Sequence, residues 1–423
     1  QLRILPSVAF ISAFLNNTPV VVIFAPIIKH WAKSVKLPAT KFLIPLSYVT
    51  ILGGICTLIG TSTNLVVHGM ILEAGYEGFT MFELGKVGIF IAIAGIIYLF
   101  IFSKRLLPDA RPDTAVPDEE VEEGEKLHRV EAVLGARFPG INKKLSDFNF
   151  QRHYGAEVKE IKTRNGQRYV DHLEDVVLRE GDTLVVMADD TFIPTWGESS
   201  VFVLLTNGND PDTSGKKKRW LALILLVLMI VGATVGELPA TKEMFPDIKL
   251  DMFFFVCITT IIMAWTNIFP ARKYTKYISW DILITIACAF AISKAMVNSG
   301  VADCVAGFII GLSDDYGPHV LLAILFVITN LFTELITNNA AAALAFPLAL
   351  SISAQLGVSP TPFFVVICMA ASASFSTPIG YQTNLIVQGI GNYKFTDFVR
   401  IGLPLNIITF LISVILIPLI WNF

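Results

Sequence analysis

A polar stretch inside a long apolar segment constrains this chain more than any other feature. Residues 333–347 read Thr-Glu-Leu-Ile-Thr-Asn-Asn-Ala-Ala-Ala-Ala-Leu-Ala-Phe-Pro, and a similar stretch occupies residues 12–26. Asn17 precedes a proline by nine residues, and so does Asn338. The offset of 321 residues between them also carries Ser12 onto Thr333. We therefore interpret the two stretches as copies of an internal repeat.

Composition places this repeat in a membrane. Apolar residues make up 54% of the chain and the mean hydropathy is +0.63, whereas soluble proteins are typically about 45–50% apolar. Many windows of about 20 residues are long enough to span a bilayer. The net charge of −3 comes with no basic face of the kind that binds nucleic acid. The five cysteines are scattered, with neither a disulfide framework nor metal-ligand spacing. We expect an α-helical polytopic membrane protein in contact with lipid.

A second pair of motifs follows the first pair in the same order. Residues 53–64 and 376–384 interrupt apolar segments with glycines and hydroxyls, and an offset of 320 carries Gly60 onto Gly380 and Asn64 onto Asn384. Such interruptions predict helices that unwind at membrane depth, which requires burial in protein or a cavity. For the Asn-rich tips, re-entrant hairpins are the favoured interpretation. The alternative at the first tip is one helix kinked at Pro19.

The basic residues predict the orientation of the two copies. Loops with lysine and arginine alternate with acidic loops, and basic loops favour the cytoplasm. The basic positions are Lys29, Lys33, Lys36, Lys41, Lys104, Arg105, Lys216–Arg219, Arg272, Lys273, Lys276, Lys394 and Arg400. The first hairpin then enters from inside and the second from outside, which defines an inverted-topology repeat. We expect a multi-pass protein of the inner (plasma) membrane with residues 108–218 in the cytoplasm.

These patterns divide the chain into five parts. We expect a first transport repeat at 1–107, a linker at 108–126, a small α/β domain at 127–206, a linker at 207–218 and a second transport repeat at 219–423. In the second repeat we expect membrane segments at 219–238, 250–269 and 278–298, a short helix around 301–313, a hairpin at 320–355, a broken helix at 361–391 and a last helix at 398–422. Almost nothing precedes the first hairpin, so we expect further N-terminal helices before Gln1.

The inserted region has its own pattern. Strands are predicted at 128–134, 156–163, 167–170 and 183–187, with a helix at 143–154 and a hairpin turn at Asn165-Gly166. Its motifs at 152–158, 163–166 and 178–184 resemble the TrkA C-terminal (RCK-C) domain. The resemblance implies either a site for a small regulator such as cyclic di-AMP or a pairing domain without a ligand. It also implies a second such domain in tandem, and we expect this second domain to be missing beside the acidic linker.

The polar motifs indicate that the protein transports ions. Half-helix N-termini suit an anion, whereas unwound carbonyls, amides and hydroxyls suit Na⁺. No acid or histidine occurs in the Asn-rich tips or the breaks, which favours Na⁺ over H⁺. Glu334 is a candidate ligand, proton relay or accessory hydrogen-bond acceptor, and the last is favoured because Ala13 stands at the matching position. Lys294 pairs with it or extends towards the interface. The alternative for the asparagines is helix–helix adhesion.

The two tips and the Thr377-Pro-Ile-Gly break resemble the divalent anion/sodium symporter (DASS) family of the ion transporter superfamily, over nearly all the membrane residues. The resemblance implies an elevator-type transporter that forms homodimers. It implies two Na⁺ sites, lined by Ser12, Asn17 and Gly60 and by Thr333, Asn338, Ser376, Thr377 and Gly380. It also implies an anion between the tips, bound by Asn16, Asn17, Thr18, Thr61, Thr337, Asn338, Asn339 and Thr377.

The departures from the family motif bear on the substrate. The family has Ser-Asn-Thr at each tip, whereas this chain has Asn16-Asn17-Thr18 and Thr337-Asn338-Asn339. Together with the inserted domain and Tyr381-Gln382, this favours the sulfate branch over the branch that carries succinate or citrate. A ligand-gated channel or an anion sensor is the alternative of another class, although no potassium-filter sequence is present. With no nucleophile–base set or metal cluster in the sequence, we expect no enzyme.

Overall fold

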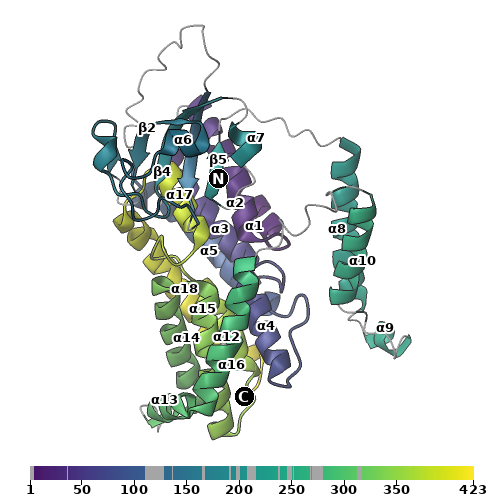
Figure 1. The fold of residues 1–423 in the computed structure, drawn as a ribbon. Helices are drawn as coiled ribbons and strands as arrows, with labels where there is room; N and C mark the ends of the chain where they lie inside the picture. The colour runs from purple at the N-terminus through teal and green to yellow at the C-terminus, as the bar shows by residue number, and fades with distance from the viewer. Residues whose placement is uncertain are drawn as a thin grey trace.

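The computed structural model describes most of the chain, as a helical bundle with a small sheet domain at one end (Figure 1). The described residues are 4–35, 37–109, 128–135, 137–163, 167–189, 192–196, 201–206, 216–236, 239–244, 250, 252–266, 268, 280–311 and 317–423. Most of both predicted linkers and the predicted Asn165-Gly166 turn lie outside them.

The first half of the bundle contains the predicted tip and break. A short turn separates two helices at residues 13–16, and a second pair is interrupted at residues 55–61. The helices are α1 (Ile4–Ser12), α2 (Asn17–Ser34), the 3₁₀ turn η1 (Ala39–Lys41), α3 (Leu43–Gly54), α4 (Ser62–Glu73) and α5 (Gly85–Leu106). The interruption falls in the segment where glycines and threonines replace apolar residues, as predicted.

In the part of the chain that the structure describes, the second half begins with five further helices and then shows the same order of interruptions. The helices are α8 (Lys216–Gly236), α9 (Pro239–Met244), α10 (Met252–Trp265), α12 (Trp280–Asn298), α13 (Val301–Gly311), α14 (Gly317–Leu335), α15 (Asn338–Leu356), α16 (Thr361–Ser372), α17 (Gln382–Gly391) and α18 (Phe395–Ile420). The short helix predicted around residue 301 is present as α13. It meets α12 at a bend of 70°.

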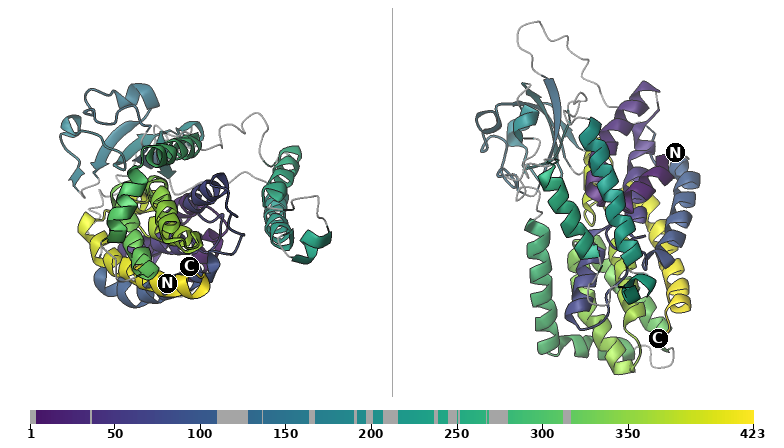
Figure 2. Two further views of the ribbon diagram at one scale, coloured as in Figure 1. Left: turned by 90° about the horizontal axis from the view of Figure 1, so that it is seen from below. Right: turned by 90° about the vertical axis from the view of Figure 1, so that its right-hand side faces the viewer.

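Among the described residues, four helices are long and apolar enough to cross a membrane. They are α5, α14, α15 and α18, and the bent α12–α13 pair is a fifth if counted as one span. The predicted spans at 219–238 and 250–269 correspond to α8 and α10, whose apolar parts fall below that length. The 14 residues of α10 rise only about 21 Å. Figures 1 and 2 show α8 and α10 together beside the main bundle.

The centre of the bundle is formed by α3 and α16. Every residue of α3 is buried, and so is every residue of α16 after Thr361. Helices α1 and α2 pack on α3, and α14 and α15 pack on α16. Each tip is therefore held against the helix that precedes the break of its own half.

The sheet domain (residues 128–206) holds an antiparallel sheet in the order β3-β2-β4-β1-β5. Its elements are β1 (His128–Leu134), α6 (Phe150–Tyr154), β2 (Glu157–Lys162), β3 (Arg168–Tyr169), the 3₁₀ turn η2 (Leu173–Asp175), β4 (Thr183–Ala188), α7 (Phe192–Trp196) and β5 (Phe202–Thr206). The four predicted strands are confirmed, whereas β5 was not predicted.

The predicted helix at 143–154 is wrong in its first half. Lys144 pairs with Val177 as an antiparallel bridge, and Leu145 N–H donates to Val176 O at 3.1 Å. These backbone bonds hold residues 143–148 against the loop before β4. Helix α6 begins only after Asn149, whose side chain accepts from Arg152 N–H and caps the helix.

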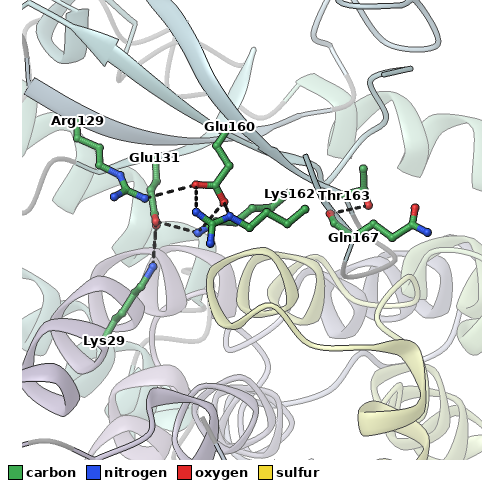
Figure 3. A network of polar contacts seen from close by, with 8 residues as sticks. Lys29, Arg129, Glu131, Glu160, Lys162, Thr163 and Gln167 are labelled. Carbon is green, nitrogen blue, oxygen red and sulfur yellow. Dashed lines mark hydrogen bonds and ion pairs between the residues drawn. The ribbon is translucent and has the colours of Figure 1, made fainter. Parts of the chain in front are cut away.

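The sheet domain contacts the bundle through Glu131 of β1, which lies in a cluster with charged residues of β2 (Figure 3). Lys29 of α2 donates to both carboxylate oxygens of Glu131, at 2.9 and 3.0 Å. Lys162 lies 3.4 Å from the same carboxylate. The neighbouring Glu160 pairs with Arg168 and, at 3.6 Å, with Arg129.

A second contact joins the sheet domain to α17. Gly181 has a φ of +83°, and a Cβ there would lie 2.7 Å from the Leu385 side chain. Glycine is therefore required both by the backbone conformation and by the close approach of α17. The sheet domain thus rests on α2 and α17, which follow the first tip and the second break.

Candidate functional site

Each tip is closed by one hydrogen bond between a hydroxyl and an asparagine. Ser12 Oγ at the end of α1 donates to Asn17 Oδ1 at 2.7 Å, and both side chains are fully buried. Thr333 Oγ1 of α14 donates to Asn338 Oδ1 at 2.9 Å. The same contact therefore occurs at the repeat offset of 321. In each case the asparagine is the first residue of the second helix of the hairpin.

Each break is closed by its own pair of bonds. Gly60 N–H donates to Thr57 Oγ1 at 3.1 Å, and Asn64 Nδ2 donates to Thr57 O at 2.9 Å. In the second break, Gly380 N–H donates to Thr377 Oγ1 at 3.3 Å, and Asn384 Nδ2 donates to Thr377 O at 3.1 Å. Side chains thus replace the helical bonds that the unwound backbone lacks, as membrane depth requires.

Tip and break form one unit in each half. Thr57 Oγ1 donates to Ala13 O, and Thr377 Oγ1 donates to Glu334 O at 3.0 Å. A Cβ on Gly380 would lie 2.3 Å from Thr333 O, so only glycine allows this approach. The structure thereby brings the predicted ligand sets together, Ser12, Asn17 and Gly60 in one half and Thr333, Asn338, Thr377 and Gly380 in the other. Ser376, also predicted, is tied to the tip by its N–H, which donates to Glu334 Oε1 at 2.8 Å.

Contacts also join one half to the other. Thr18 Oγ1 of the first tip donates to Gln382 Oε1 at 3.2 Å. Asn339 Oδ1 of the second tip accepts from Ser62 Oγ at 3.4 Å and from Thr63 Oγ1 at 3.2 Å. Each tip therefore touches the helix that follows the break of the opposite half.

A buried tyrosine lies where the two halves meet. Tyr381 OH accepts from Asn17 Nδ2 at 2.5 Å and lies 3.1 Å from Thr61 Oγ1. Asn338 is a further side-chain partner of the same hydroxyl. The predicted site residues did not include Tyr381, although its unusual size after Gly380 was a signal in the sequence.

Two predicted substrate contacts lie outside this meeting point. The side chain of Asn16 is exposed at the first tip. Thr337 is also exposed, and its hydroxyl accepts from Ala340 N–H at 3.4 Å as the N-cap of α15. The structure therefore gives Thr337 a capping contact, and within the described part of the chain it shows no hydrogen bond from the Asn16 side chain to the opposite half.

Glu334 accepts hydrogen bonds beside the second break. Its Oε1 accepts from Ser376 N–H at 2.8 Å and from Asn406 Nδ2 at 2.7 Å, and its Oε2 lies 3.5 Å from Ser374 Oγ. Through these contacts the carboxylate of the second tip is joined to the second break and to α18. Lys294 is exposed, and the described part of the chain shows no ion pair between it and Glu334.

Each half also contains a buried amide oxygen without a hydrogen-bond donor among the described residues. These atoms are Asn64 Oδ1, whose amide group is bound to the first break, and Asn406 Oδ1, whose amide group is bound to Ser376. No group of three or more His, Cys, Asp or Glu side chains that could hold a metal occurs among the described residues. Apart from the Glu334 carboxylate beside the second break, the oxygens available as ligands in the two tips and breaks are neutral, the kind that suits a small alkali cation.

Comparison with known proteins finds similarity to membrane transporters. A family model described as citrate transporter matches residues 2–350 and 244–423. An uncharacterised transporter of Synechocystis is 30% identical over 97% of this chain and 81% of its own length. Sodium/sulfate cotransporter 2 of Chlamydomonas reinhardtii is 30% identical over 66% of this chain and 31% of its own length. A sodium-dependent dicarboxylate transporter of Staphylococcus saprophyticus is 25% identical over 34% of this chain and 28% of its own length.

Proposed function

Because this chain belongs to the citrate transporter family, and is therefore a membrane transporter and no enzyme, we propose that it is a Na⁺-coupled symporter of a small divalent anion, with sulfate favoured. The observation that carries the proposal is the set of hydrogen bonds that recurs in both halves and converges on Tyr381. Such a constellation holds neutral oxygens and amide donors at the centre of the bundle, where a cation and an anion can bind together.

The recurring bonds also support an inverted-topology repeat with two re-entrant hairpins. Ser12–Asn17 and Thr333–Asn338 correspond at one offset. Figure 1 shows α17 beside the sheet domain and α4 towards the opposite end, although the two helices follow equivalent breaks. Helices that follow equivalent motifs but run towards opposite ends are typical of inverted repeats.

Two Na⁺ sites follow from this arrangement. The first is proposed at Ser12, Asn17 and Gly60, and the second at Thr333, Asn338, Ser376, Thr377 and Gly380. The unsatisfied oxygens of Asn64 and Asn406 support a cation near each break, because a buried acceptor without a donor is costly. Relatives named as sodium/sulfate and sodium-dependent dicarboxylate transporters support Na⁺ as the coupling ion.

The substrate lies between the tips in this proposal. Thr18, Thr61, Asn339 and Tyr381 offer hydroxyl and amide donors there. Sulfate is favoured over a dicarboxylate because a sodium/sulfate cotransporter matches a larger share of the chain than the dicarboxylate transporter does. A di- or tricarboxylate such as succinate or citrate is the second candidate, supported by the family description and by the dicarboxylate relative.

Regulation by the sheet domain, in the cytoplasm, is a further part of the proposal. A cavity of about 370 Å³ there is lined by Thr163, Gln167, Tyr169, His172, Asp175, Val176, Val177, Arg179 and Asp182. It is near the lower end of the range for small-molecule sites, about 300–1,000 Å³. A regulator such as cyclic di-AMP is proposed to bind there, and an assembly role without a ligand is the alternative. Calorimetric titration of the whole protein, with Arg179→Ala as the comparison, separates the two.

The transport mechanism is proposed to be elevator-like, within a homodimer. The α8–α10 pair stands apart from the bundle and exposes apolar side chains, which supports a role at a subunit or lipid interface. Native mass spectrometry of the purified protein measures the number of subunits.

Uptake of labelled sulfate and succinate into proteoliposomes tests the function. We expect sulfate accumulation that requires an inward Na⁺ gradient. Uptake that does not depend on the Na⁺ gradient would overturn the proposed Na⁺ coupling. Succinate uptake that is unaffected by excess sulfate would reverse the proposed preference for sulfate.

A further inference from the structure

Tyr381 occupies the point where both halves of the candidate site converge. Its hydroxyl contacts Asn17 of the first tip, Thr61 of the first break and Asn338 of the second tip. Tyr381 itself belongs to the second break, and only 8% of its surface is exposed. One phenol oxygen therefore joins all four polar motifs.

The position of Tyr381 in the repeat explains why it can reach every motif. The offset of 320 that carries Gly60 onto Gly380 also carries Thr61 onto Tyr381, and these two residues lie within hydrogen-bonding distance of each other at 3.1 Å. Two equivalent residues that touch must lie close to the pseudo-twofold axis that relates the two halves of the proposed repeat. The first half places a short threonine there, whereas the second half places a whole aromatic ring.

The hydrogen bonds limit the space between the tips. The 2.5 Å bond from Asn17 Nδ2 places the phenol oxygen against the first tip, and Asn338 of the second tip is a further partner of the same oxygen. The phenol oxygen lies between them, so an anion bound by both tips must share this space with the ring. A phenol has one O–H donor in addition to its acceptor lone pairs, and Asn17 Nδ2 uses only a lone pair. Either oxygen can be the donor in the contact with Thr61 Oγ1, so the phenol proton can be directed to an anion in place of Thr61.

We propose that Tyr381 is the specificity-determining residue of the anion site. Its ring reduces the space between the tips to the size of a compact tetrahedral dianion such as sulfate. Its hydroxyl donates a hydrogen bond to one of the anion's oxygens. A longer dicarboxylate, whose charges are separated by a carbon chain, does not fit while the ring is in place. This inference rests on the proposed function and names the structural reason for the sulfate preference.

Two substitutions separate the ring from the hydroxyl. Tyr381→Thr introduces the residue of the equivalent position and removes the ring, so we expect gain of Na⁺-driven succinate uptake and a rise in the KM for sulfate of roughly tenfold or more. Tyr381→Phe keeps the ring, so succinate stays excluded. Its sulfate KM rises roughly ten- to hundredfold, the range for a lost hydrogen bond to a charged group.

The control is Tyr98→Phe, which removes a buried hydroxyl that donates to Ile401 O at 3.0 Å outside the site. We expect the Tyr98→Phe variant to keep the wild-type KM for sulfate and to show no uptake of succinate. The Na⁺ concentration for half-maximal uptake is measured in every variant, and we expect Tyr381→Phe to leave it unchanged because the phenol is not a proposed Na⁺ ligand.

The outcomes distinguish the inference from the function on which it rests. Wild-type sulfate uptake with unchanged selectivity and KM in both Tyr381 variants would overturn the role of Tyr381 and leave the transporter function standing. A wild-type protein that carries succinate as well as it carries sulfate would also overturn that role. If the wild type carries neither anion, the proposed function fails first, and the inference fails with it.

Discussion

At the scale of the residue, Asn338 and Asn17 are predicted to carry Na⁺ coupling. Each asparagine accepts a hydroxyl bond within its tip, and each is buried in the set of oxygens proposed to bind Na⁺. Replacing either with alanine removes one amide oxygen from the proposed ligands. We expect the Na⁺ concentration for half-maximal uptake to rise roughly tenfold or more, by the energy of one charge-assisted contact.

Na⁺ titrations of sulfate uptake measure this effect for Asn17→Ala and Asn338→Ala separately. Gln355→Ala is the matched control, because Gln355 lies on the same helix as Asn338 and contacts Asp303 O far from the tip. Normal Na⁺ dependence in both asparagine variants would contradict the two-site arrangement.

The role of Glu334 is also decided at a single residue. As an accessory acceptor, its carboxylate fixes the break through Ser376 N–H and Asn406 Nδ2. Glutamine keeps a carbonyl oxygen that can accept such bonds. We therefore expect Glu334→Gln to retain Na⁺-driven uptake with an unchanged pH profile and to lose about 1 kcal/mol of stability.

Uptake measured from pH 6 to pH 8, together with thermal unfolding, tests this expectation. Glu334→Ala serves as the comparison, since it removes the acceptor altogether and should lower uptake strongly. A shifted pH profile in Glu334→Gln would instead identify the carboxylate as a proton relay.

The residues of the candidate site were predictable to the extent that they recur. Asn17, Asn338, Gly60 and Gly380 were predicted because the same spacing occurs twice in the sequence. Tyr381 and Asn406 were not, because neither matches its counterpart in the other half and their partners lie far away in sequence, as Asn17 does from Tyr381. Only packing brings such residues together.

At the scale of the element, the contact between α2 and β1 is predicted to depend on Glu131. Burial of the carboxyl opposes its ionisation, but Lys29 and Lys162 outweigh this effect and lower the pKa of Glu131 from 4.5 to about 2. A lowered pKa stabilises the folded state above pH 4.5, and this contribution is lost as the pH falls towards 2.

We expect Glu131→Gln to lower the free energy of unfolding of the sheet domain by about 1–3 kcal/mol near pH 7, because the two lysines lose their shared partner and the pair is only partly exposed. Thermal unfolding monitored at pH 7, 4.5 and 3 measures the effect, and the difference from wild type should shrink at the lowest pH.

Glu157→Gln is the control, since Glu157 pairs with Lys159 at 2.7 Å on the exposed side of β2. It should change stability little. Equal destabilisation by both variants would show that the α2 contact contributes nothing specific.

The elements themselves were largely readable from the sequence. Glycine and threonine in an apolar run located both breaks, and alternation located four of the five strands. The first half of the helix expected at 143–154 did not form, because backbone pairing with the loop around Val177 competes with local helical propensity. The contact of the sheet domain with α2 was unpredictable, since Lys29 and Glu131 look like ordinary surface charges and lie 102 positions apart.

At the scale of the whole molecule, the proposed inverted repeat fixes which ends of the helices face the cytoplasm. The basic loop at Lys394 follows α17 beside the sheet domain, whereas Glu77 follows α4 towards the other end of the bundle (Figure 1). The pattern of basic and acidic loops assigns the first end to the cytoplasm. Residues 77 and 394 should therefore be reached from opposite sides of the membrane.

Single cysteines test this in a background in which the five native cysteines are replaced. We expect Glu77→Cys to react with a membrane-impermeant maleimide in intact cells and Lys394→Cys to react only after permeabilisation, because the charged reagent cannot cross the bilayer. Sulfate uptake by each variant verifies that the fold is retained. Labelling of both cysteines from the same side would contradict the inverted arrangement, since α17 and α4 would then end on one face and the two tips could not approach the centre from opposite directions.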